Sequence, residues 1–155
     1  MYSQDVNRDI LSPVSFLIRS ARVYPNKVAV VYEDQRYTYS EFQGRVHQLA
    51  NGLQKKGIGP GDKVVFICPN TPPMLEAHYA VPMIGAVLVC INTELSGQEY
   101  LNIINHSDAK AVFVDYECAP SIQPVEEQLH KVELFVNICE GSGSPLLRGC
   151  EYELF

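Results

Sequence analysis

The sequence of 155 residues has no tryptophan, no Cys-x-x-Cys pair, no basic run and no apolar stretch long enough to cross a bilayer. The missing Cys-x-x-Cys spacing argues against a zinc site, because structural zinc is usually held by such closely spaced pairs. A formal net charge of −6 without a basic segment argues against nucleic acid as a partner. The first residues lack the apolar core of a signal peptide, so we expect a cytoplasmic protein with no membrane span.

The composition is that of a folded protein with a substantial core. Hydrophobic residues make up 46% of the chain and charged residues 19%, which is typical of a globular rather than a disordered protein. We expect one α/β domain over residues 1–155, with a flexible N-terminus at 1–10, a core at 11–138 and a poorly defined tail at 139–155. The one linker-like stretch, Gly141 to Pro145, lies in that tail.

The cysteines are odd in number and share no regular spacing. We expect them to be reduced, buried structural thiols, since free cysteine behaves as a small hydrophobe. They are Cys68, Cys90, Cys118, Cys139 and Cys150.

Helical and strand patterns alternate along the chain. The spacing of apolar and capping residues predicts, in order, a helix after Ser12, hairpin strands at Val28–Tyr32 and Arg36–Tyr39, a helix after Ser40, a strand at Lys63–Cys68, a helix after Thr71, a strand at Val87–Ile91, a helix at Ser96–Asn105, a strand at Lys110–Asp115, a helix at Pro120–His130 and a strand at Val132–Ile138. This rhythm predicts a doubly wound α/β core with a mostly parallel sheet, preceded by a helix and a β-hairpin.

Finer signals mark where individual elements begin and end. Ser40 is a good N-cap, with Gln43 placed for a capping box. Gly57 can end the same helix in the left-handed conformation, and Asp62 is interpreted as a turn residue. The segment from Cys150 to Phe155 is interpreted as the start of a short helix.

Three stretches carry a family resemblance. They are Arg36–Phe42, a strand entering a helix; Gly57–Val65, a glycine and aspartate turn before a buried strand; and Asn70–Val87, the central helix. In order and spacing they resemble the N-terminal portion of the adenylate-forming (AMP-binding) superfamily, most of all its fatty-acyl and other acyl-CoA synthetases.

The resemblance also implies what the chain lacks. The family's ATP-binding loop, rich in Ser, Thr and Gly and ending in Lys-Gly, lies beyond the matched stretches, and Gly141–Pro145 is not a substitute because no lysine follows it. Glu94 stands where close relatives usually carry arginine. We therefore expect no cofactor for this chain and no adenylation of acids by it alone; ATP, magnesium and CoA are expected only for a full-length ligase.

Candidate catalytic residues come from the central helix. His78 lies four residues before Pro82, whose ring removes a helical hydrogen bond and loosens the preceding turn. A histidine there can act as acid or base, and Glu76 and Tyr79, three residues apart, can face one another beside it. The alternative is a structural histidine near the core. His106 is interpreted as a helix-terminal residue.

Three interpretations of the function stay open. The chain is an inactive N-terminal segment of an acyl-CoA-synthetase-like ligase, with apolar surfaces that favour homo-oligomers. Alternatively, it is a repurposed enzyme that uses His78, Glu76 and Tyr79, without ATP, to isomerise, cyclise or cleave a hydrophobic carboxylic acid or a polyketide-like natural product. In the third interpretation it is a non-catalytic binding or regulatory partner of an intact synthetase.

Overall fold

The computed structural model describes residues 12–138 and 147–152. Its elements are, in chain order, α1 (Pro13–Val23), β1 (Val28–Tyr32), β2 (Gln35–Thr38), α2 (Tyr39–Lys55), β3 (Lys63–Ile67), α3 (Pro72–Met83), β4 (Val87–Cys90), α4 (Gly97–Ser107), β5 (Ala109–Asp115), α5 (Ala119–Ile122), the 3₁₀ helix η1 (Gln123–Gln128), β6 (Leu134–Ile138) and β7 (Cys150–Glu151). The α/β prediction is confirmed. The predicted flexible N-terminus, the linker-like stretch and Cys139 lie outside the described residues.

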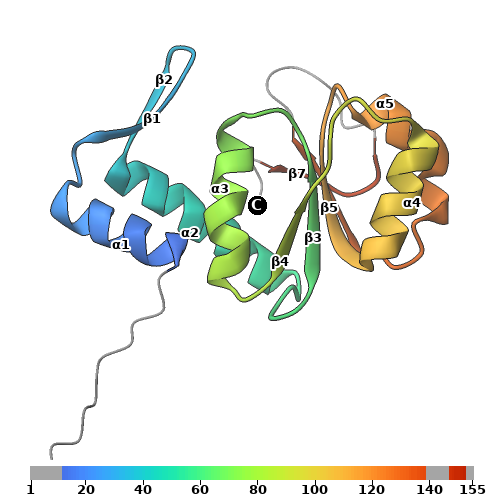
Figure 1. Ribbon diagram of the computed structural model, residues 1–155, viewed down its shortest axis with the longest axis horizontal. Coiled ribbons are helices and arrows are strands. Elements are labelled where there is room, and N and C mark those ends of the chain that lie inside the picture. Colours follow the sequence, from blue (N-terminus) through green and yellow to red (C-terminus); the bar gives the residue numbers. More distant parts are fainter. Residues whose placement is uncertain (1–11, 139–146, 153–155) are drawn as a thin grey trace, which may run out of the picture.

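A five-stranded sheet forms the centre of the protein (Figure 1). The strand order is β4-β3-β5-β6-β7, and every adjacent pair is parallel. Helices α2 and α3 cover one face, while α4, α5 and η1 cover the other. Since both faces are buried, neighbouring residues of a strand enter different cores: Phe66 packs on the α3 side and Val65 on the α4 side. This double burial explains why the central strands are continuous apolar runs.

The start of α2 differs from the prediction. Thr38, not Ser40, is the N-cap, because Thr38 has extended backbone while Ser40 is already helical. The Glu41 N–H donates to Thr38 Oγ1 at 3.3 Å, and the Thr38 N–H donates to Glu41 Oε2 at 2.8 Å. This reciprocal capping box lets β2 run directly into the helix.

Two further predictions near the C-terminus were wrong. The expected helix at Pro120–His130 is one α-helical turn followed by a 3₁₀ segment, and Pro124, which has no N–H, lies at its start. Cys150 and Glu151, which were expected to start a helix, instead form strand β7 beside β6, and residues 153–155 of that prediction lie outside the described residues. Asn137 fixes this return of the chain, since its side chain donates to the Leu147 carbonyl at 3.2 Å and accepts from the Leu147 N–H at 3.3 Å.

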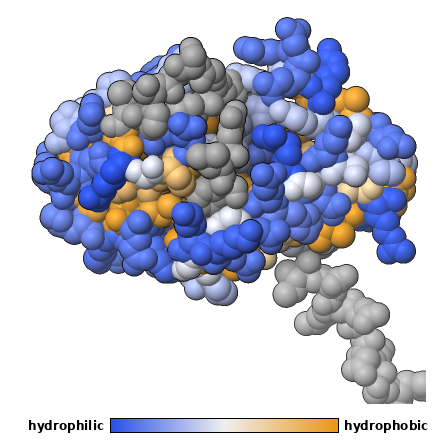
Figure 2. Space-filling model, turned by 180° about the vertical axis from the view of Figure 1, so that it is seen from behind, coloured by the Kyte–Doolittle hydropathy of each residue, from blue (hydrophilic) through white to orange (hydrophobic). Residues whose placement is uncertain are grey.

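The surface of the N-terminal part carries exposed apolar side chains. Figure 2 shows apolar areas at the end of the molecule that holds α1 and the hairpin, broken up by polar side chains. The larger exposed groups there are Phe16, Ile18, Val23, Tyr24, Val28 and Val31. The predicted tendency to form homo-oligomers stays a prediction.

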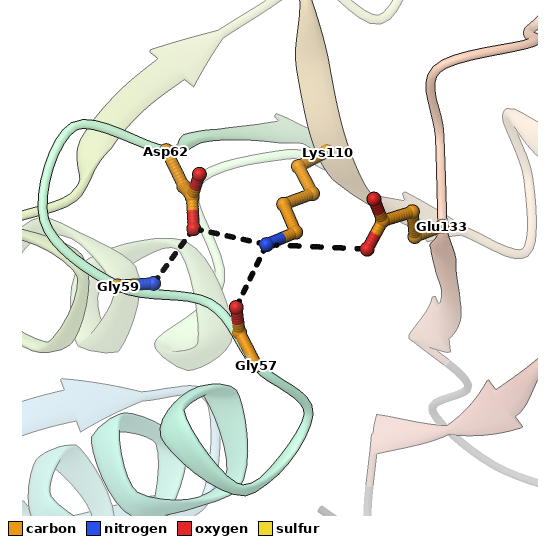
Figure 3. Close-up of polar contacts among 5 residues, drawn as sticks. All are labelled: Gly57, Gly59, Asp62, Lys110 and Glu133. Atoms are coloured by element: carbon orange, nitrogen blue, oxygen red, sulfur yellow. Dashed lines mark hydrogen bonds and ion pairs between the residues drawn. The ribbon is translucent and has the colours of Figure 1, made fainter.

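A polar cluster joins three strands at their amino ends (Figure 3). Lys110 Nζ donates to the Gly57 carbonyl at 2.8 Å and to Asp62 Oδ2 at 3.3 Å, and it lies 3.9 Å from Glu133 Oε2. The Gly59 N–H donates to Asp62 Oδ2 at 2.8 Å. Asp62 is therefore the turn residue that was predicted, and it ties the turn before β3 to the start of β5.

Substitution of Asp62 should reduce stability in a pH-dependent way. The Gly59 N–H, assisted by Lys110, holds the pKa of the Asp62 carboxyl below its ordinary value. A lowered folded-state pKa adds stability above the unfolded pKa of about 4, and this stability is lost as the pH falls through the folded pKa. We expect Asp62→Asn to cost about 1 kcal/mol or less at pH 7, because the site is partly exposed, and to cost nothing at strongly acid pH. Urea unfolding at several pH values measures this.

Glu133→Gln is the matched control. The Glu133 side chain is 70% exposed, and its polar contact among the described residues is the 3.9 Å approach to Lys110, so its loss should change the free energy of unfolding little at any pH. An Asp62→Asn cost that stays constant down to strongly acid pH would contradict the prediction.

Candidate functional site

A cavity of about 310 Å³ lies between the hairpin and the start of α3. Its walls are residues 30–32 of β1, residues 70–72 at the entry to α3, and Met74, Leu75 and His78 of the helix. Most of these side chains are apolar. His78 contributes an imidazole to this lining, so the cavity combines mostly apolar walls with a group that can act as an acid or a base.

His78 is held by its own helix. Nδ1 lies 2.8 Å from the Met74 carbonyl oxygen, which can only accept a hydrogen bond. Nδ1 therefore carries the proton of the neutral ring, and Nε2 keeps a free lone pair. The residue is exposed rather than close to the core, and whether its role is structural or catalytic stays a prediction.

Glu76 occupies a different environment, facing α2 and β7. It is 1% exposed, and Arg45 Nε donates to its Oε1 at 2.5 Å. The Tyr152 hydroxyl donates to its Oε2. Arg45 also lies over the Tyr37 ring, 4.8 Å from its centroid. Both carboxylate oxygens are thus occupied by donors, which suits Glu76 to holding the C-terminal strand in place.

Tyr79 packs against the same neighbouring helix. Its ring meets Phe42 edge-on, with the centroids 5.5 Å apart. The structure therefore places Glu76 and Tyr79 toward α2 and His78 at the cavity, and the three side chains do not converge on one point. Their assignment as catalytic residues stays a prediction.

The carboxyl ends of β3 and β5 form a second polar region, where the strand order reverses. Sheets of this kind commonly bind ligands at that point. Asp115 is 4% exposed, and its Oδ1 accepts from the Glu117 N–H at 3.0 Å. Burial raises the pKa of Asp115. Sequence reasoning did not single out this residue, although an aspartate that ends an apolar strand was the available signal.

The neighbouring thiols are inert. Burial, assisted by the charge of Asp115, raises the pKa of Cys68 to about 12 and that of Cys118 to about 11. Both stay protonated near neutral pH and are poor nucleophiles. All four cysteines of the described part are free, as predicted, but Cys90 is exposed rather than buried, because it ends the edge strand β4.

In the part of the chain that the structure describes, the remaining histidines have no partners that point to catalysis. His47 and His130 are exposed, and His106 lies in the last turn of α4, the helix-terminal position that was predicted for it. Within residues 12–138 and 147–152, no three His, Cys, Asp or Glu side chains come close enough together to hold a metal ion. In the same ranges, no helix has the length and apolar character that crossing a membrane requires.

Comparisons with known proteins match most of the chain. A family model described as AMP-binding enzyme matches residues 17–145. The chain is 35% identical over 156 residues to a peroxisomal butyrate–CoA ligase of Arabidopsis thaliana, covering 96% of the chain and 27% of the relative. It is 43% identical over 127 residues to a 4-hydroxybutyrate–CoA ligase of Metallosphaera sedula, covering 82% of the chain and 23% of the relative. The chain thus spans about a quarter of the length of these relatives.

Solved structures agree with the sequence relatives. A crystal structure of an anthranilate–CoA ligase in complex with anthranoyl-AMP superposes with a TM-score of 0.80 at 28% identity. The match covers 86% of this chain and 26% of that structure. The parallel sheet and its helices are therefore the corresponding part of a larger CoA-ligase fold.

Proposed function

The chain belongs to the AMP-binding enzyme family and resembles part of a CoA ligase, and we propose that alone it supplies the N-terminal framework of such an enzyme without adenylating acids. The observation that carries the proposal is the missing phosphate-binding motif. Adenylation needs positioned phosphates and cationic groups where negative charge develops. The sequence holds no glycine-rich loop followed by lysine.

The chemistry of the sheet's carboxyl edge supports the same proposal. Asp115, Cys68 and Cys118 gather there, and an acid beside two neutral thiols offers no positive charge to a triphosphate. The interactions that hold the fold together, by contrast, are present. Two apolar cores cover both sheet faces, and Asp62 and Glu76 tie distant segments together.

Pyrophosphate exchange tests the proposal directly. The purified chain, incubated with ATP, magnesium, labelled pyrophosphate and a panel of carboxylic acids from acetate to long-chain fatty acids, should incorporate no label above the protein-free background. A full-length butyrate–CoA ligase is the positive control. Acid-dependent exchange by the pure chain, lost after Asp115→Asn, would overturn the proposal.

The cavity beside His78 supports a second candidate function, binding of a hydrophobic carboxylic acid without ATP. Its volume of about 310 Å³ suits a small apolar molecule. A protonated His78 at its wall can pair with a carboxylate, and the relatives above are named for small acids of this kind. In this candidate His78 is the acid or base of the predicted isomerase, cyclase or lyase step. Glu76 and Tyr79 then contribute indirectly, because their contacts with α2 fix the position of the helix α3 that carries His78.

A bulky substitution at the cavity wall tests acid binding. Val31 lines the cavity and is 60% exposed, so Val31→Trp should fill the cavity with little effect on folding. We expect it to weaken binding of a C4–C8 fatty acid about tenfold or more, measured by calorimetry. Val28→Trp is the matched control, because Val28 lies on the same strand, is 46% exposed and does not line the cavity. Equal effects of the two variants would exclude the cavity as the site.

A further inference from the structure

Two sulfur atoms and an imidazole nitrogen lie close together at the side of the cavity, contributed by Met74, Cys90 and His78. Cys90 Sγ lies 3.7 Å from Met74 Sδ and 3.9 Å from His78 Nε2. Met74 and His78 are four residues apart on α3, so they share one face of the helix. Cys90 comes from the adjacent end of β4. Two elements thus place a thioether and an imidazole within 4 Å of one thiol.

The imidazole is already in the form that a metal requires. The contact of His78 Nδ1 with the Met74 carbonyl at 2.8 Å places the proton on Nδ1 and leaves the Nε2 lone pair directed away from the helix backbone. A hydrogen bond from the other ring nitrogen to a carbonyl is the usual support of a metal-bound histidine. Nε2 is also the atom that faces Cys90.

The spacing of the donors fits a three-coordinate ion. Three ligands about 2.2 Å from a central ion in a trigonal plane lie roughly 3.8 Å from one another. The two separations from Cys90 Sγ match this value. We propose that Met74, His78 and Cys90 form a binding site for a soft monovalent cation, namely Cu(I).

The charge balance and the ligand types favour Cu(I) over zinc. On binding, the Cys90 thiol releases its proton to water and the thiolate bonds the ion, with no change of oxidation state. One thiolate and one Cu(I) give a neutral unit, which suits the apolar wall of the cavity. Thioether sulfur is a soft ligand that selects Cu(I), whereas zinc sites are usually completed by four nitrogen, oxygen or thiolate ligands. This inference does not rest on the proposed function.

Copper titration of the whole chain tests the site. The reduced protein is titrated anaerobically with Cu(I) in competition with a chromophoric chelator. We expect one tight equivalent per chain, and copper X-ray absorption should show two sulfur ligands and one nitrogen. Met74→Leu and His78→Gln should each weaken this binding about tenfold or more, and Cys90→Ser should abolish it. Cys150→Ser is the matched thiol control and should leave the affinity unchanged.

Several results would overturn the proposal. Unchanged affinity in both Met74→Leu and His78→Gln would mean that Cys90 binds copper as a lone thiol. A loss in Cys150→Ser equal to that in Cys90→Ser would place the ion elsewhere. Circular dichroism checks that each variant is folded. If one variant unfolds, copper X-ray absorption of the unmodified protein still tests the proposal. A copper coordination shell without nitrogen, or with one sulfur, would exclude the three-donor site.

Discussion

Phe113→Ala should lower the free energy of unfolding by about 3–5 kcal/mol, the loss typical of a large aromatic side chain removed from a packed core. Phe113 lies in the middle of β5, the central strand, and is fully buried. Its ring stacks on Phe66 of β3, with centroids 4.3 Å apart and planes 7° from parallel. Tyr152 meets the same ring edge-on at 6.2 Å. The substitution therefore opens a cavity between two strands and the C-terminal segment at once.

Urea unfolding followed by circular dichroism measures this loss, and Phe16→Ala is the matched control. Phe16 is 53% exposed on α1, so the same chemical change there should alter the free energy of unfolding by about 0.5 kcal/mol or less. If Phe113→Ala leaves no folded protein, Phe113→Leu, which removes less volume, should give a measurable and smaller loss. A Phe113→Ala cost no greater than that of Phe16→Ala would show that the stack does not form.

The central sheet could be predicted because its information is local. Each buried strand is an apolar run bounded by polar residues, such as Lys63 at the start of β3 and Asp115 at the end of β5, and the structure places these strands within two residues of the prediction. The first residue of α2 could not be predicted from local pattern in this way. Thr38 and Ser40 are both good N-cap residues, and the decision depends on where the extended backbone of β2 ends.

The C-terminal strand depends on contacts that no local pattern reveals. Gly149 adopts a φ of +126°, and a Cβ there would lie 2.1 Å from the Phe135 carbonyl oxygen. Only glycine permits this close approach to β6. The sequence shows a glycine but not the neighbouring strand that requires it, so a short helix was predicted for residues that form β7.

The candidate site was predictable only in part for the same reason. Helical spacing correctly separates His78 from Glu76, while α3 continues through Pro82 to Met83 and the loosened turn before Pro82 stays a prediction. It cannot show that Arg45, 31 residues earlier, and Tyr152, 76 residues later, occupy the Glu76 carboxylate. Nor does it show that Cys90 ends an exposed edge strand beside Met74.

Glu76→Ala should be the most damaging substitution of a charged residue, with a loss of about 2–4 kcal/mol in the free energy of unfolding. The carboxylate is 1% exposed and accepts from two donors, Arg45 and Tyr152. Its removal leaves the Tyr152 hydroxyl buried without its acceptor and Arg45 without its partner. Because the Arg45 side chain is 37% exposed, water can rehydrate part of its charge, which keeps the expected loss below that of a fully buried ion pair.

Glu94→Ala is the control for loss of an exposed carboxylate and should change stability by about 0.5 kcal/mol or less. Glu76→Gln keeps the volume and one acceptor, so its loss should fall between those of the two alanine variants. Equal losses in Glu76→Ala and Glu94→Ala would contradict the role of the buried carboxylate.

A double-mutant cycle isolates the bond between Glu76 and Tyr152. Burial, and then the charge of Glu76, raises the pKa of the Tyr152 phenol, so the phenol keeps its proton and acts as the donor throughout the working pH range. Tyr152→Phe and Glu76→Gln should therefore be non-additive, with a coupling of about 1–2 kcal/mol in urea unfolding. Additive losses would mean that Tyr152 holds β7 by packing on Phe113 alone. A coupling of the expected size would make this one carboxylate the link between α3 and the returning C-terminal strand.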